Sequence, residues 1–144
     1  MKVLLDECVP APVHPILRYL LRGHEVDYVP ELGWASKKDI PLLGDAAKRG
    51  YAMFVTNDLN QFNDPDECDA IKRSRMHHVT YETEDGLDGL GRATGAICAA
   101  MRGIVEDLDA APAQRLARVT TLSGRTKRYR ISDPSIDPPS GYWK

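Results

Sequence analysis

The chain has 144 residues, a length that suits one compact domain with a sizeable buried core. Its three widely separated cysteines argue against a disulfide framework or a Cys-rich zinc site and indicate a reducing, cytoplasmic environment. The net charge is only −2, and the apolar run at the N-terminus is too short for a signal peptide or a membrane span, which predicts no contact with a membrane.

Strand and helix patterns alternate along most of the chain. Short apolar runs predict strands over residues 2–6, 25–29, 51–55 and 77–81. Apolar residues spaced three or four apart predict a helix from 13 to 21, a second ending at 50, a short third ending near 75, and a long fourth over 87–108. Ser36 is the predicted N-cap of the second helix, with Asp39 completing a capping-box pattern. The alternation predicts an α/β domain with a parallel sheet.

The segment after residue 112 differs from the rest. Residues 118–131 contain two strand-like runs around a Ser-Gly turn, which predicts a β-hairpin, and the Pro-rich residues that follow predict an irregular tail. We therefore divide the chain into a domain over 1–112 and an extension over 113–144.

The predicted hairpin is basic. Residues 113–132 hold six basic side chains and no acidic one, whereas the residues before them are net acidic. Such a segment is typical of an arm that binds a polyanion, and a solvated hairpin that happens to be basic is the alternative. The candidates to bind RNA or a protein partner are Arg125, Lys127, Arg128 and Arg130.

Carboxylates follow two predicted strands and lie at the start of a helix. Asp6 and Glu7 end the first strand, Asp58 follows the third, and Asp39 lies in the first turn of the helix between them. Because ligands of a parallel sheet bind beyond the carboxyl ends of its strands, we expect Asp6, Asp39 and Asp58 to meet at one edge. Taken singly, Asp39 is equally explained as a capping residue and Asp58 as a turn residue.

Electrostatics indicates what such a cluster would bind. Two carboxylates about 5 Å apart repel by roughly 3 kcal/mol at an effective dielectric of about 20, so three together require a proton or a cation. Ligand sets made of oxygen atoms favour Mg²⁺ or Mn²⁺ over zinc, and these ions assist displacement at phosphorus. The cluster therefore predicts a divalent-metal site suited to phosphodiester chemistry.

The same residues carry a family likeness. The stretches "MKVLLDECVP" (1–10), "GHEV" (23–26), "ELGW" (31–34), a Ser-x-x-Asp helix start (36–39) and "FVTNDLNQF" (54–62) follow one another in order. Together they resemble the PIN-like nuclease superfamily, in particular its short bacterial branch of VapC-type toxins with an LLDE motif and a T-x-D motif. The resemblance covers residues 1–85.

The resemblance implies a three-layer α/β/α sandwich around a mainly parallel sheet, here with a C-terminal β-hairpin extension. It implies a Mg²⁺- or Mn²⁺-dependent ribonuclease in which Asp6, Asp39 and Asp58 hold the metal and act in catalysis. Glu7 would hold a water molecule or support a ligand, and Thr56 would orient Asp58 by a hydrogen bond.

The chain departs from the family pattern at three positions of the site, one of which is Gln61, an extra residue before Phe62. Asn60 stands where the second Asp of T-x-D-x-D-F is expected, and Asp64 is a candidate to replace that missing acid. Cys8 stands where an Asn usually follows the first acid pair.

The predicted function is therefore that of a cytoplasmic, metal-dependent ribonuclease, the toxin of a toxin–antitoxin pair. Its expected partners are RNA, a small antitoxin protein and a second copy of the chain. One alternative is a PIN-like module that binds its partner without cleaving. The other is a receiver-like phosphoacceptor domain, in which Thr80 would supply the hydroxyl after the fourth strand, although the expected lysine after a fifth strand is missing.

Overall fold

A computed structural model describes residues 1–120 and 129–144 of the chain. Its strands are β1 (Lys2–Leu5), β2 (Glu25–Tyr28), β3 (Met53–Thr56), β4 (His77–Tyr81), β5 (Leu116–Val119) and β6 (Tyr129–Ser132). Its α-helices are α1 (Val13–Leu20), α2 (Asp39–Lys48), α3 (Pro65–Ser74) and α4 (Gly86–Asp109), and its short 3-10 helices are η1 (Val29–Leu32) and η2 (Leu59–Asn63).

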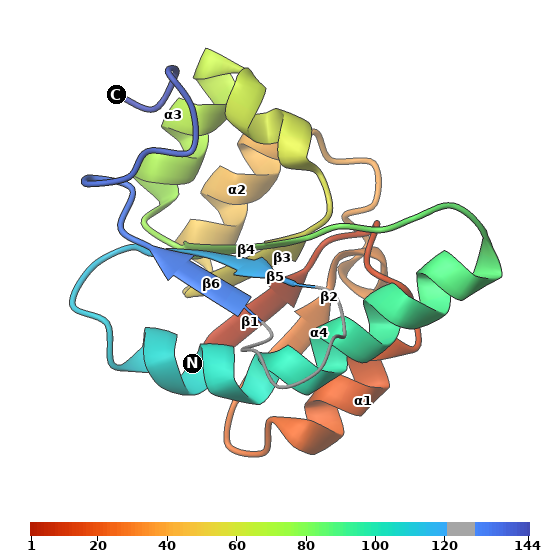
Figure 1. Cartoon of the computed structure of the whole chain (residues 1–144). Helices are drawn as coiled ribbons and strands as arrows, with labels where there is room; N and C mark the ends of the chain where they lie inside the picture. The colour runs from red at the N-terminus through yellow and green to blue at the C-terminus, as the bar shows by residue number, and fades with distance from the viewer. Residues whose placement is uncertain (121–128) are drawn as a thin grey trace.

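The six strands form one sheet in the order β2-β1-β3-β4-β5-β6. The first five are parallel to their neighbours, and β6 pairs antiparallel with β5. Helices α1 and α4 cover one face of the sheet, and α2 and α3 cover the other (Figure 1). This arrangement confirms the predicted three-layer α/β fold with a mainly parallel sheet.

Two apolar cores hold the layers together. The larger core joins one face of the sheet to α1 and α4, and includes Leu5, Leu17 and Ile97. The smaller joins the opposite face to α2 and α3, and includes Phe54 and Leu43. Because β1 and β3 are buried on both faces, they read in the sequence as continuous apolar runs instead of alternating ones.

The predicted start of the second helix is wrong. Helix α2 begins at Asp39, and its N-cap residue Lys38 makes no capping hydrogen bond through its side chain. A start capped by Ser36 would put Pro41 beyond the first turn, where proline removes a helical hydrogen bond and its ring clashes with an earlier carbonyl. With the start at Asp39, Pro41 lies in the first turn, where no partner for its missing N–H is needed.

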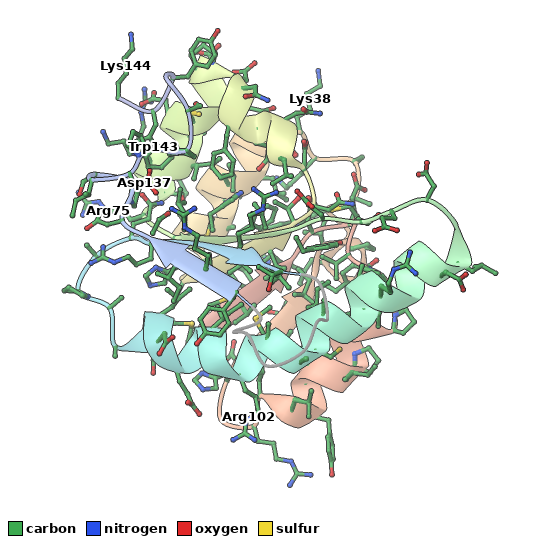
Figure 2. The ribbon with its side chains drawn as sticks, viewed as in Figure 1. Lys38, Arg75, Arg102, Asp137, Trp143 and Lys144 are labelled. Atoms are coloured by element: carbon green, nitrogen blue, oxygen red, sulfur yellow. The ribbon has the colours of Figure 1, made fainter. Side chains whose placement is uncertain are left out.

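The C-terminal segment extends the central sheet. Strands β5 and β6 pair antiparallel, as a hairpin requires, while the predicted Ser-Gly turn with Arg125, Lys127 and Arg128 lies outside the described residues. The Tyr129 ring of β6 packs on Gly103 of α4, where a Cβ atom would come within 3.0 Å of the ring. Figure 2 shows the side chains of the tail, including Trp143, which packs against the smaller core.

Within the described part of the chain, no helix is long and apolar enough to cross a membrane.

Candidate active site

Three acidic residues from separate segments line one open pocket at the carboxyl edge of the sheet. Asp6 follows β1, Asp58 follows β3 and Asp39 is the first residue of α2. Strands β1 and β3 are hydrogen-bonded neighbours with Leu5 opposite Val55, so their carboxyl ends lie together. The pocket has a volume of about 960 Å³. We call it the carboxylate pocket.

The Asp6 carboxylate is held in place by hydrogen bonds from both sides. Its Oδ1 accepts from the backbone N–H of Glu7 at 2.8 Å, and its Oδ2 accepts from the Thr56 hydroxyl at 2.7 Å. Asp6 is only 7% exposed and Thr56 is fully buried. Asp6 is therefore oriented before any ligand arrives. Orienting a catalytic or metal-binding group in this way is the usual role of the residues around it.

The Thr56 hydroxyl joins the two strand ends. It donates its proton to Asp6 and accepts from the backbone N–H of Asp58 at 3.1 Å. The Asp58 carboxylate in turn accepts from the backbone N–H of Asn60 at 3.0 Å. Thr56 thus reaches Asp58 through the main chain, while its side-chain proton goes to Asp6.

Cys8 lies against the same carboxylate. Its sulfur lies 3.4 Å from Asp6 Oδ2 and 3.4 Å from the Thr56 hydroxyl oxygen. Desolvation of the sulfur raises the pKa of Cys8 to about 11, so the thiol is protonated at neutral pH. Cys8 consequently donates to Asp6 as a neutral group.

The electrostatics of Asp39 show that the acids affect one another. Burial raises the pKa of Asp39, the polar side chain of Gln61 lowers it, and the charges of Asp6 and Asp58 raise it further. The net effect is a raised pKa, which means that the ionised cluster is strained in the folded protein. A bound cation would relieve that strain.

Glu67 belongs to this acidic group although the sequence did not single it out. It lies in the first turn of α3, and burial together with the charges of Asp39, Asp58 and Asp64 raises its pKa. Asp64, the predicted replacement acid, caps α3 by accepting from the backbone N–H groups of Asp66 and Glu67 at 2.8 and 3.0 Å. The Asp-x-x-Glu spacing, typical of a helix start, was the available signal for Glu67.

Two arginines line the carboxylate pocket together with the acids. Arg92 of α4 pairs with Glu84, and Arg118 of β5 pairs with Glu82. These four side chains are about half exposed or more. In contrast, Arg130 of the predicted basic hairpin pairs with Asp137 at 2.8 Å and lines a smaller neighbouring pocket of about 300 Å³.

The donor chemistry of the carboxylate pocket fits a hard divalent cation. Over residues 1–120 and 129–144, no group of three or more His, Cys, Asp and Glu side chains is spaced to hold a metal ion by itself. Mg²⁺ does not require such a cage, because it keeps several of its waters and is bound through one or two carboxylates. The residues therefore fit a hydrated ion better than a closed site made of protein ligands.

The chain matches the model of the PIN like domain family over residues 1–83, which is more than half of its length. The chain belongs to the PIN-like domain family. Comparisons with curated proteins and with solved structures found no match. PIN-like membership indicates a nuclease-type function in general terms, and the matched segment contains Asp6, Asp39, Asp58 and Glu67. Arg92 and Arg118 lie beyond it.

The receiver-like alternative gains no support from the pocket. Thr80, which would have to supply the phosphate-binding hydroxyl, is buried and lines the smaller pocket instead of the carboxylate pocket.

Proposed function

We propose that this PIN-like protein is a Mg²⁺- or Mn²⁺-dependent ribonuclease that hydrolyses RNA phosphodiester bonds at the carboxylate pocket. The observation that carries the proposal is that Asp6, Asp39 and Asp58, from three segments distant in sequence, line one pocket. The nuclease-type function indicated by the family supports it.

In this proposal the three aspartates hold the cation, directly or through its waters. A divalent cation supplies Lewis-acid stabilisation of phosphoryl oxygens and activates water for in-line displacement. The contribution of the protein is orientation, because Thr56 and the Glu7 N–H fix Asp6 before substrate binds. The Glu7 side chain also lines the pocket and can hold a water molecule there.

The arginines supply contacts for the RNA backbone. Exposed ion pairs such as Arg92–Glu84 and Arg118–Glu82 contribute only about 0–1 kcal/mol, so either guanidinium can exchange its carboxylate partner for a phosphate at little cost. Arginine binds phosphate through two parallel hydrogen bonds, which favours this exchange.

The charge of the pocket predicts an order of binding. Among the residues that the structure describes, six carboxylates and two guanidinium groups line it, and this excess of negative charge disfavours a polyanion in the absence of metal. The six are Asp6, Glu7, Asp39, Asp58, Glu82 and Glu84. A bound divalent cation reduces this repulsion, and RNA binding at the pocket therefore depends on metal.

We further propose that the protein is the toxin of a toxin–antitoxin pair. The support is the likeness of its N-terminal motifs to the VapC-type branch, and the basic segment that includes Arg130 is a candidate surface for an acidic antitoxin. A small open reading frame beside the gene, whose product suppresses the activity, is the expected finding.

The alternative is a PIN-like module that binds a partner without cleaving RNA. Asn60 favours it, because this residue lines the pocket at the position where the family motif has an acid and adds no negative charge. Such a module would bind Mn²⁺ poorly and would still bind its partner.

The deciding experiment is RNA cleavage in the presence of Mg²⁺ or Mn²⁺ by wild type, Asp6→Asn and Asp58→Asn. Asp69→Asn is the matched control, since Asp69 lies on α3 and pairs with Arg73 on the helix surface. We expect cleavage by wild type and the control, and its loss in the two site variants and in EDTA. Equal cleavage by all four proteins, or indifference to EDTA, would show that the assignment is wrong.

A further inference from the structure

Gln61 of η2 is buried, and its side chain lacks one hydrogen-bond partner. Its side chain is 1% exposed. Across the described residues, its amide nitrogen is the sole buried side-chain nitrogen or oxygen without a hydrogen-bond partner. An unpaired buried amide costs about 1–3 kcal/mol, so an unpaired group of this kind calls for an explanation.

The other end of the Gln61 amide is held by a buried histidine. His78 Nε2 lies 3.1 Å from Gln61 Oε1, and the imidazole packs against Phe54 and Phe62 with ring centroids 5.5 Å away in each case. Complete burial lowers the pKa of His78 to about 4, so the ring is neutral at neutral pH. It has one N–H group, which Gln61 Oε1 can accept.

This contact sets the direction of the amide group. Because the Gln61 oxygen faces His78, the Gln61 NH₂ group points away from His78. Gln61 lowers the pKa of Asp39, which places the Asp39 carboxylate on the side of this NH₂ group. The opposite amide orientation would turn the oxygen toward a carboxylate and cost electrostatic energy. The missing partner and the effect on Asp39 are both explained if the nitrogen faces this carboxylate from just beyond ordinary hydrogen-bond length.

We propose that His78 and Gln61 form a buried relay that positions the Asp39 carboxylate to bind the divalent cation. Gln61 is a positioning residue, because it acts through Asp39 and not on substrate. The inference rests on the proposed function, in which Asp39 is a ligand of the cation. Asp39 is the first residue of α2 and Gln61 belongs to the separate element η2, so their contact forms only when the two elements pack together.

Variants separate this role from a role in stability. Gln61→Met removes the amide and leaves the N–H of His78 unpaired, so it weakens both Mn²⁺ binding and the fold. The double variant Gln61→Met/His78→Phe replaces both polar partners by apolar groups of similar size, which restores much of the lost stability. We expect both variants to bind Mn²⁺ about 10- to 100-fold more weakly than wild type, the usual effect of losing a partner of a metal ligand.

The measurements are Mn²⁺ titration by calorimetry and unfolding in urea on the same proteins. Recovery of stability without recovery of Mn²⁺ affinity in the double variant supports the relay. A double variant that binds Mn²⁺ as tightly as wild type overturns it.

An NMR experiment on the metal-free protein tests the relay independently of the nuclease proposal. We expect the side-chain NH₂ signals of Gln61 to shift in Asp39→Asn, and to stay in place in the control Asp45→Asn, a surface residue of α2 that pairs with Lys37. If wild type fails to bind Mn²⁺ but these signals shift in Asp39→Asn, the proposed function is wrong and the contact between Gln61 and Asp39 is supported. If these signals do not shift in Asp39→Asn, the proposed relay is wrong even if the protein binds Mn²⁺.

Discussion

Replacing Thr56 by valine tests the way in which the carboxylate pocket is held together. The substitution keeps the β-branched shape and removes the hydroxyl that donates to Asp6 at 2.7 Å and accepts from the Asp58 N–H at 3.1 Å. A hydrogen bond to a charged group contributes about 1.5–3 kcal/mol, and one between neutral groups about 0.5–1.5 kcal/mol. Because Thr56 is fully buried and its bond to Asp6 is buried, water does not replace that bond.

The expected loss for Thr56→Val is therefore about 2–4 kcal/mol in the free energy of unfolding. Thr80→Val is the matched control, because Thr80 lies directly opposite Thr56 on the neighbouring strand β4. It is also buried, but it lies outside the carboxylate pocket. We expect the control to lose less than about 1 kcal/mol.

Urea unfolding followed by tryptophan fluorescence measures both losses, and Mn²⁺ titration reports whether Asp6 is still oriented. We expect Mn²⁺ affinity to fall in Thr56→Val and to remain in Thr80→Val. Equal destabilisation of the two variants, with unchanged Mn²⁺ affinity in both, would refute the argument that Thr56 organises the site.

Three further predictions concern charge. The folded state raises the pKa of Asp39 and of Glu67, so each stabilises the fold below its ordinary pKa and loses this contribution as the pH rises through the raised value. Accordingly, Asp39→Asn should gain stability over wild type as the pH increases from 4 to 7, and a constant difference in urea unfolding would contradict this reasoning. Mn²⁺ at about 100 times its dissociation constant should stabilise wild type by about 2.7 kcal/mol in a thermal-shift assay, and the same shift in Asp6→Asn would argue against binding at the pocket. Arg92→Gln and Arg118→Gln should change stability by less than about 1 kcal/mol and reduce the salt dependence of RNA binding, whereas an unaltered salt slope would place the RNA elsewhere.

The architecture could be predicted from the sequence because its signals are local. Residues 2–6 and 51–55 read as strands buried on both faces, and the structure has β1 and β3 in the middle of a parallel sheet. The placement of Asp6 and Asp58 followed from the same logic, since neighbouring parallel strands end at one edge. The capping box failed because Pro41 constrains where α2 begins, and this constraint outweighs a weak Ser-x-x-Asp signal.

The remaining parts of the site depend on contacts between elements that are distant in sequence. The sequence alone determined that three acids end up at the carboxyl edge of an α/β sheet, because strand patterns and chain order specify that edge. The tertiary structure decided which groups surround them: Thr56 bonds Asp6 across two strands, and Gln61 is held by His78 from β4. Such contacts carry no periodic signal in the sequence, since they arise when separate elements pack and each buried polar group must find a partner.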